Sequence, residues 1–298
     1  MIALERRAKQ LGANAVVNIV SYYQRVEMSS TTDFECHAGA VIAGVHSRAT
    51  LSRLTHNKID MFSAAVWLLD GNLVDENDIG FFEQQLGASE TIKYAGFKRR
   101  ERKRQFLLGR MLLRFTVSNL LCLRQDALDV VERTGYPPLL VLPDSHSLQP
   151  SFSLSHSREW VACVASFRIQ LGIDIEVNDA TRDVLGISKF IFHPNEHRLL
   201  LPLNEAARLS AFYQLWCTKE ALYKLSTNSG HEKLLSPLLG ANGAFATEGP
   251  GWYRYTVPHS FLTVAICTDR PLIEIHKIEL TGLSRAKWLA ANRKIDIN

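Results

Sequence analysis

Phe212-Tyr-Gln-Leu-Trp-Cys-Thr-Lys-Glu-Ala-Leu-Tyr-Lys224 carries large apolar residues at helical spacing and predicts a helix with one buried face. Lys219, Glu220 and Lys224 are set into this pattern. Glu220 and Lys224 are one helical turn apart, so they share a side of the helix. Such a carboxylate could hold a metal ion or accept a proton. The alternative is an exposed salt bridge, which stabilises a helix only weakly.

A second pattern lies upstream, in Leu171-Gly-Ile-Asp-Ile-Glu-Val177. Its alternation and β-branched residues predict a strand, on which Asp174 and Glu176 share one face. Two neighbouring carboxylates repel each other unless a cation lies between them, and hard divalent ions prefer oxygen ligands. The stretch therefore indicates either a metal site or, alternatively, a strand edge that faces solvent.

Together the two stretches resemble the signature of 4′-phosphopantetheinyl transferases of the surfactin-synthetase-activating type. Phe152-Ser-Leu-Ser-His-Ser157 matches the Ser-His element of that family, and the resemblance covers about residues 61–275. It implies an α+β fold with two similar α/β halves related by pseudo-twofold symmetry. The halves would be residues 61–165, on the coenzyme A side, and residues 166–298, with the metal and the catalytic helix.

The resemblance also implies the reaction. 4′-Phosphopantetheine would pass from coenzyme A to a serine of an apo acyl or peptidyl carrier protein, and adenosine 3′,5′-bisphosphate would be released. The expected cofactor is Mg²⁺, with Mn²⁺ as the alternative ion, held by Asp174, Glu176 and Glu220. Magnesium commonly joins a few carboxylates to substrate phosphates.

The remaining roles follow from the same resemblance. Glu220 would accept the proton of the carrier serine, or act only as a metal ligand. Lys224 would neutralise charge on the transferred phosphate, and Lys219 would do likewise or face the carrier. Ser155 and His156 would contact the pyrophosphate.

A basic run follows Phe97, and residues 98–114 combine a charged first half with the apolar spacing of a buried helix. In the resembling family, basic residues here help to hold coenzyme A. Arg100 and Arg104 are one turn apart and could bind phosphate oxygens bidentately. Arg110 could be structural or ligand-facing. The alternative is a non-catalytic anion- or nucleic-acid-binding protein that uses this run, although it lacks interleaved aromatic residues.

Thr134-Gly-Tyr-Pro-Pro138 is typical of a turn because of its glycine and prolines. The resembling family often has Gly-Lys-Pro here, near the adenine and phosphates of the coenzyme. Gly135 is present, but Tyr136 replaces the lysine. Tyrosine could stack on adenine, yet it brings no charge for phosphate.

Composition fits a soluble globular protein of two packed units, with 298 residues and a net charge of +4. The five cysteines lack CxxC spacing, which predicts reduced thiols, with a catalytic role for Cys217 as a weaker alternative. No signal-like start and no apolar stretch of about twenty residues occurs. We therefore expect a cytoplasmic monomer whose partners are coenzyme A and an acidic carrier, without nucleic acid or membrane.

Residues 1–56 lie outside that resemblance and predict a small α-β-β extension of unknown role, with a helix over 2–11 and strands over 15–23 and 34–45. They resemble the end of a YbjQ-like domain, a group associated with heavy-metal binding. Cys36 and His37 are adjacent, so on a strand they face opposite ways and cannot easily share an ion. A packing or oligomer-forming role fits this segment better.

The remaining pattern predicts the other elements. A strand over 151–155 would deliver His156 just past its end, and Asn204 would cap the key helix. A peripheral helix would close the chain at 284–292. Further strands are expected at 64–70, 139–142, 160–167 and 169–177, with antiparallel strands at 252–257, 261–267 and 273–280, and further helices at 83–86, 89–94, 185–192 and 194–201.

Overall fold

The structure is a computed structural model that describes residues 62–143, 149–229, 238–240 and 244–293, together with two short strands near the N-terminus. The chain divides into a unit of residues 1–58 and a unit of residues 59–298. In the first unit, β1 (Val20–Tyr23) pairs antiparallel with β2 (Val26–Ser29). The predicted helix over 2–11 and strand over 34–45 lie outside the described residues.

The second unit alternates strands and helices, which confirms the predicted α+β class; the pseudo-twofold symmetry stays a prediction. Its strands are β3 (Ser63–Asp70), β4 (Asp129–Arg133), β5 (Tyr136–Val141), β6 (Ser151–Ser157), β7 (Trp160–Ser166), β8 (Leu171–Val177), β9 (Glu248–Gly249), β10 (Trp252–Thr256), β11 (Leu262–Thr268) and β12 (Glu274–Leu280). Its helices are α2 (Glu76–Glu83), α3 (Ala88–Gly96), α4 (Arg100–Leu121), α5 (Val184–Ile191), α6 (Pro194–Leu200), α7 (Glu205–Ser229) and α8 (Arg285–Arg293).

Two four-stranded sheets form the centre of this unit, with orders β12-β3-β7-β6 and β8-β11-β10-β9. β12 pairs in parallel with β3, so the prediction that the last three strands are mutually antiparallel is wrong for β12. The final strand therefore belongs to the same sheet as β3, β7 and β6. The division into halves at residues 61–165 and 166–298 stays a prediction.

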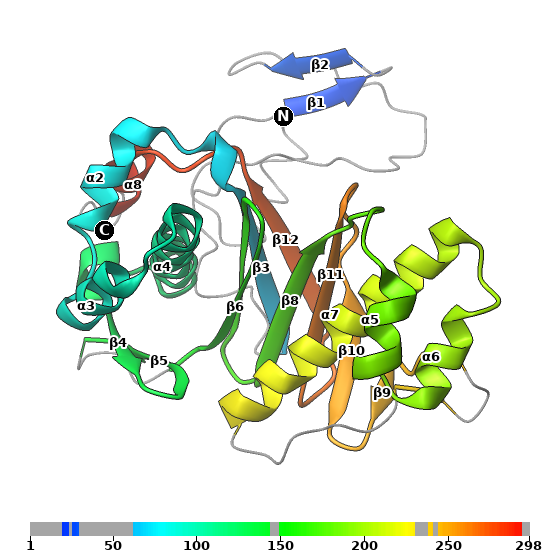
Figure 1. Cartoon of the computed structure of the whole chain (residues 1–298). Coiled ribbons are helices and arrows are strands. Elements are labelled where there is room, and N and C mark those ends of the chain that lie inside the picture. The colour runs from blue at the N-terminus through cyan, green and yellow to red at the C-terminus, as the bar shows by residue number, and fades with distance from the viewer. Residues whose placement is uncertain are drawn as a thin grey trace. The chain divides into compact units, whose positions relative to one another are not determined.

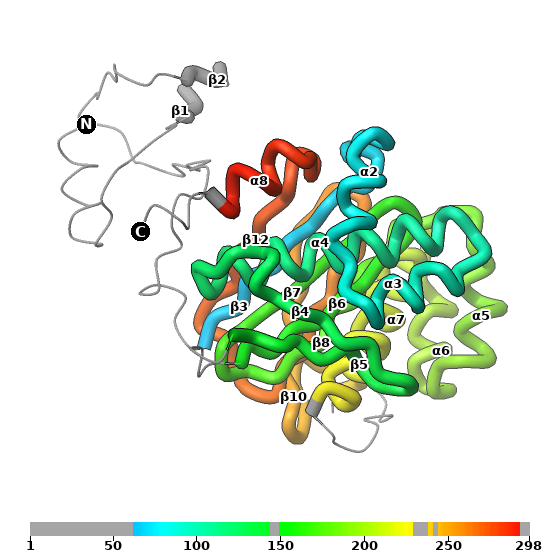
Figure 2. The backbone as a smooth tube through the Cα atoms, turned by 90° about the vertical axis from the view of Figure 1, so that its left-hand side faces the viewer, coloured from blue at the N-terminus to red at the C-terminus, as the bar shows by residue number. Residues whose placement is uncertain are grey.

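Helices cover the two sheets on opposite sides (Figure 1). α7 packs on β8 and β11, with α5 and α6 beside it, whereas α4 packs on β3, β6 and β7. Figure 2 looks onto the side that carries α2, α3, α4 and the β4–β5 hairpin. None of the helices in the described residues has the length and apolar character needed to cross a bilayer.

α8 is part of the core, and the prediction that the last helix is peripheral is wrong. Trp288 is 1% exposed and its ring meets that of Phe82 edge-on, with centroids 5.8 Å apart. Asn292 accepts a hydrogen bond from the backbone N–H of Gln125 at 2.8 Å. The sequence predicted a helix over 284–292 but not the surface on which it packs.

β8 lies between two apolar cores, and its successive side chains point alternately to one core and to the other. Leu171, Ile173 and Ile175 join an apolar cluster with β3, β7 and β11. The intervening residues of β8 face α7, whose apolar side forms a second cluster with α5 and α6. Because successive side chains of a strand point to opposite faces, the carboxylates of β8 lie on the α7 side.

Candidate functional site

α7 approaches β8 so closely that only glycine fits at position 172. A Cβ there would lie 2.1 Å from the carbonyl oxygen of Ala221 and 2.6 Å from the backbone N of Leu225. Any larger residue would push the helix away from the strand. Gly172 therefore brings the helix face of Glu220 and Lys224 against the carboxylates of β8.

The start of α7 follows the prediction. Asn204 accepts a hydrogen bond from the backbone N–H of Ala207 at 2.9 Å, which confirms it as the cap. From there the helix runs to Ser229. Glu220, Lys224 and Asn228 recur every four residues on it and so line one face.

Asp174 is buried and holds the centre of this contact. Its Oδ1 lies 2.8 Å from Lys224 Nζ and accepts a hydrogen bond from the Ser155 hydroxyl at 2.8 Å. Lys224 also donates to Ser155 Oγ at 3.0 Å and to the carbonyl oxygen of Ile173 at 2.9 Å. Asp174 Oδ2 is buried and has no hydrogen-bond partner within the described residues.

The two glutamates beside Asp174 share its electrostatic environment. Burial raises the pKa of Glu176 above its usual value, and the negative charge of Asp174 adds to this increase. Burial and Asp174 likewise raise the pKa of Glu220, although Lys224 opposes the shift. In both glutamates, burial and the charge of Asp174 outweigh the nearby positive charges, which are Arg182 and Lys224 for Glu176 and Lys224 for Glu220.

The chemistry of these donors fits a hard divalent cation. Asp174 offers a buried, unpartnered oxygen, and burial together with the charge of Asp174 makes ionisation of the two glutamates less favourable. Oxygen-only ligands of this kind suit Mg²⁺. In the described part of the chain no three His, Cys, Asp or Glu side chains are gathered as a ready-made metal cluster, and Lys224 neutralises Asp174 instead.

His156 lies within β6, not just past the end of the strand as predicted. Its Nε2 is 2.8 Å from an Nη of Arg102 on α4. Because guanidinium only donates hydrogen bonds, Nε2 accepts, and the neutral ring carries its proton on Nδ1. Desolvation by the surrounding protein, together with the charges of Arg102 and Lys224, lowers the pKa of His156 to about 4. The histidine is therefore uncharged at neutral pH.

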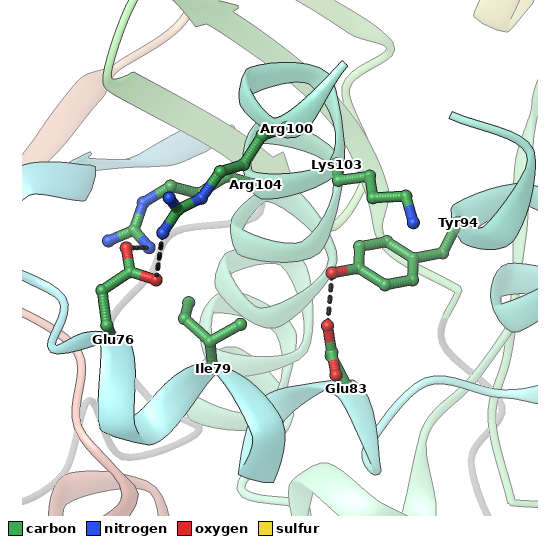
Figure 3. A pocket seen from close by; sticks show the side chains of 7 residues that line it. All are labelled: Glu76, Ile79, Glu83, Tyr94, Arg100, Lys103 and Arg104. Atoms are coloured by element: carbon green, nitrogen blue, oxygen red, sulfur yellow. Dashed lines mark hydrogen bonds and ion pairs between the residues drawn. The ribbon is translucent and has the colours of Figure 1, made fainter. Parts of the chain in front are cut away.

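Arg100 and Arg104, the two arginines predicted to hold the coenzyme, face α2, and their role in coenzyme binding stays a prediction. Arg100 and Arg104 both pair with Glu76 of α2, and they line a pocket of about 230 Å³ together with Tyr94 and Lys103 (Figure 3). Arg104 also donates to the carbonyl oxygens of residues 71 and 74 at 2.9 and 2.7 Å. The arginine of this run that reaches the Ser-His element is Arg102.

The apolar half of the basic run buries its charges in ion pairs. Arg110 pairs with Glu132, and Arg114 pairs with Glu90, whose side chain is fully buried, at 2.6 Å. Of the two roles considered for Arg110, the contacts support the structural one. The second half of residues 98–114 therefore presents no basic face, whereas Lys98, Arg99, Arg100 and Arg102 in the first half are exposed.

Lys219 points away from Lys224, toward α6. Its Nζ lies 3.0 Å from Glu196, which is fully buried. Glu196 also accepts hydrogen bonds from the backbone N–H groups of His193 and Leu238 at 2.8 and 2.7 Å. This lysine thus ties α7 to the start of α6.

Thr134 and Gly135 form the turn between β4 and β5, whereas Tyr136, Pro137 and Pro138, which were predicted to belong to the turn, lie in β5. Gly135 adopts φ 76°, a left-handed conformation that favours glycine. The Tyr136 side chain is 70% exposed, and its ring lies 5.8 Å from the Arg133 guanidinium. An exposed aromatic ring beside a cation is compatible with stacking on a base.

Cys217 lies one turn before Glu220 on α7 and is buried. Its thiol donates to the carbonyl oxygen of Thr263 at 3.6 Å. Burial raises the pKa of this thiol well above its ordinary value, and the charges of Asp174 and Glu176 add to the increase. A thiol held protonated in this way is a poor nucleophile.

Sequence reasoning missed three polar groups at this site. Arg102 was overlooked because charge alone does not fix the register of a basic helix. Asn228 donates to the carbonyl oxygens of Phe152 and Leu171 at 3.1 and 2.9 Å. The Ser157 hydroxyl donates to Glu176 at 2.8 Å. The serines at every second position of residues 153–157 were the available signal, since this spacing puts them on one face of a strand.

Comparison with known proteins relates part of this chain to one family. Residues 170–245, which include β8 and α7, match the family described as the 4′-phosphopantetheinyl transferase superfamily. The chain is 30% identical over 151 residues to the 4′-phosphopantetheinyl transferase HetI of Nostoc sp., 26% over 153 residues to the transferase gsp of Aneurinibacillus migulanus, and 28% over 187 residues to psf-1 of Bacillus pumilus.

The matches leave part of each chain unaligned. They cover 50%, 51% and 60% of this chain and 62%, 61% and 76% of the Nostoc, Aneurinibacillus and Bacillus proteins. The predicted resemblance to 4′-phosphopantetheinyl transferases is thereby confirmed for the part of the chain that carries the site. The resemblance of residues 1–56 to a YbjQ-like domain stays a prediction.

Proposed function

We propose that this chain is a 4′-phosphopantetheinyl transferase that moves the phosphopantetheine arm of coenzyme A onto a serine of an apo carrier protein. The observation that carries the proposal is the meeting of three segments at Asp174. β6 brings the Ser-His element, β8 brings the paired acids, and α7 brings Glu220 and Lys224. The names of the similar proteins support the same reaction.

In the proposed step, the carrier serine oxygen attacks the β-phosphorus of coenzyme A. A bond forms between the serine oxygen and this phosphorus, and the bond from phosphorus to the bridging pyrophosphate oxygen breaks. Adenosine 3′,5′-bisphosphate leaves with that oxygen. The serine proton passes to Glu220, directly or through water; the alternative role of Glu220 is that of a metal ligand only.

The positive groups would hold the phosphates. Arg102 and Lys224 both lower the pKa of neutral His156 by their charge, in addition to the larger effect of burial. Arginine and lysine beside an uncharged ring make a site for anions, and arginine matches phosphate oxygens with two donors. We assign the pyrophosphate of coenzyme A to these residues.

Asp174, Glu176 and Glu220 are the residues that would hold Mg²⁺. When bound, this ion supplies positive charge that offsets the three carboxylates and the pyrophosphate. The unpartnered Oδ2 of Asp174 supports the assignment. Acidic carriers from fatty-acid, polyketide and nonribosomal-peptide synthesis are all proposed acceptors.

The rival function, binding of nucleic acid by residues 98–114, has less support. Arg110 and Arg114 are buried in ion pairs, and Arg104 is tied to α2. Nucleic-acid binding through phosphate contacts needs exposed cations and weakens steeply with salt. These three arginines are held in contacts within the protein, which leaves the exposed Lys98, Arg99, Arg100 and Arg102 as the cations of the run that could meet phosphate.

The test is a loading assay. Purified full-length protein, labelled coenzyme A, Mg²⁺ and a panel of apo carriers should yield labelled carrier. Asp174→Ala should lower the rate by more than about 100-fold, whereas a loss within tenfold, about 1.4 kcal/mol of barrier, would remove the metal assignment. Failure to load any carrier would count against the transferase itself.

A further inference from the structure

The two sheets meet edge to edge along β6 and β8, and side chains make the hydrogen bonds there. These strands belong to separate sheets. The hydroxyl oxygens of Ser153, Ser155 and Ser157 accept hydrogen bonds from backbone N–H groups of β8 at 3.2, 3.3 and 3.1 Å. The donors are residues 173, 175 and 177, so three serine rungs join two strands that run in the same direction.

Each rung satisfies a backbone donor that is buried or, at residue 177, partly buried. The three serines are 5–8% exposed, so water does not replace them easily. Buried N–H groups in proteins are almost always paired, and a hydroxyl is an adequate acceptor. The serine spacing at every second residue matches the period of a strand and keeps all three hydroxyls on the side that faces β8.

The rungs differ in what happens to the hydroxyl proton. Ser155 donates its proton to Asp174 and Ser157 donates its proton to Glu176, each at 2.8 Å. Ser153 has no carboxylate to donate to, because the corresponding residue of β8 is Gly172. The chain thus contains two rungs that carry an acid and one matched rung that does not.

The orientation of Glu176 depends on its serine hydrogen bond more than the orientation of Asp174 does. Asp174 is also fixed by Lys224. Within the residues that the structure describes, the Ser157 hydroxyl is the one hydrogen-bond donor to the Glu176 carboxylate. A glutamate has three rotatable side-chain bonds, so a half-buried one with a single anchor would lose its direction if the anchor were removed.

We propose that Ser157 is a positioning residue, which fixes the carboxylate of Glu176 for divalent-cation binding while its oxygen joins β6 to β8. This inference rests on the proposed function, in which Glu176 is a magnesium ligand. Groups that orient metal ligands from behind change metal affinity by roughly 10- to 100-fold when they are removed.

The experiment compares Ser157→Ala with Ser153→Ala. Each variant removes one buried rung, but only the first removes a donor to a carboxylate. Mg²⁺ is titrated into full-length protein saturated with coenzyme A, and its dissociation constant is measured by calorimetry. We expect about 10-fold weaker Mg²⁺ binding for Ser157→Ala and a change within twofold for Ser153→Ala, with similar losses in melting temperature.

Ser157→Thr supplies the rescue, because it retains a hydroxyl that can accept from the N–H and donate to Glu176. Its Mg²⁺ affinity should return to within about threefold of the original protein. Equal Mg²⁺ affinities of the two alanine variants, or a folded threonine variant as weak as Ser157→Ala, would overturn the inference. Absence of Mg²⁺ binding by the unaltered protein would instead refute the metal assignment of the proposed function.

Discussion

Lys224 on α7 and Asp174 on β8 are 50 residues apart in sequence, yet Nζ and Oδ1 lie 2.8 Å apart. The aspartate side chain is 8% exposed and the lysine side chain is 26% exposed. Ser155 bonds to both of them. This partly buried ion pair contributes to the stability of the fold as well as to the proposed chemistry, because loss of one partner leaves the other charge poorly solvated.

Lys224→Met should therefore destabilise the fold and lower transfer activity together. We expect the free energy of unfolding to fall by about 2 kcal/mol, measured by urea denaturation. Adding Asp174→Asn should recover part of that loss, because the buried charge is then removed. A double-mutant coupling below about 0.5 kcal/mol would show that the pair does not act as a unit. Arg100→Met, which breaks an exposed pair with Glu76, is the control and should cost under about 0.5 kcal/mol.

Arg102→Gln should raise the pKa of His156 from about 4 toward 6.5, as followed by NMR of the imidazole. The guanidinium is one cause of the lowered pKa, so its removal lets the ring take up a proton more easily. Arg104→Gln is the matched control. That residue faces Glu76 rather than His156, and the pKa should not move.

The same pKa shift predicts how stability depends on pH. The unfolded chain holds a proton on His156 below about 6.5 and the folded chain holds it only below about 4. Between these values the unfolded state binds more protons, so the contribution of His156 to the free energy of unfolding rises with pH. Arg102→Gln should flatten this rise, and an unchanged slope would mean that Arg102 does not control the histidine.

The sequence predicted local features well where one residue pattern determines them. The alternation of residues 171–177 gave the strand and the shared face of Asp174 and Glu176 correctly, and Asn204 was recognised as the cap of α7. The partners of long charged side chains were harder to predict. Lys219 turns toward Glu196, and Arg102 rather than Arg100 or Arg104 reaches His156. A helical repeat defines a face to within about one residue, and tertiary contacts decide the rest.

The order of strands in the sheets could not be predicted from local sequence patterns either. β12 has the exposed, alternating pattern of an edge strand, but its parallel pairing with β3 joins residues more than 200 positions apart. Nothing in residues 274–280 distinguishes this partner from β11. The same holds for α8, since an amphipathic pattern identifies a buried side without naming the surface that covers it.

Lys219→Met and Glu220→Gln should have opposite effects, although the two residues are adjacent: the first should lower stability and the second should lower the loading rate. Lys219 pairs with buried Glu196, so its loss should cost about 1 kcal/mol of stability and leave carrier loading within about threefold. The charge of Asp174 acts on Glu220 and helps to raise its pKa. Replacement of Glu220 should lower the loading rate by at least about 100-fold with little change in stability. A larger rate loss for Lys219→Met would restore the predicted role of that lysine in phosphate binding.

Deletion of residues 1–56 should leave transfer activity intact. The segment lies within the unit of residues 1–58, whereas all residues assigned to the site belong to the unit of residues 59–298. Loading rate and melting temperature of the shortened protein should match those of the full chain within about twofold and a few degrees. Loss of loading with the fold retained, as checked by circular dichroism, would assign the N-terminal unit a part in the reaction.

Trp288→Ala should be the most damaging change outside the site. The indole is 1% exposed and contacts Phe82, so truncation leaves a large cavity between α2 and α8. Core Trp or Phe truncations cost about 3–5 kcal/mol, and urea denaturation should report a loss in this range. Leu289→Ala is the control, because the adjacent leucine is 38% exposed and should cost under about 1 kcal/mol. Equal, small losses for both variants would mean that α8 does not pack on α2 in solution, and the peripheral helix predicted from the sequence would then be correct.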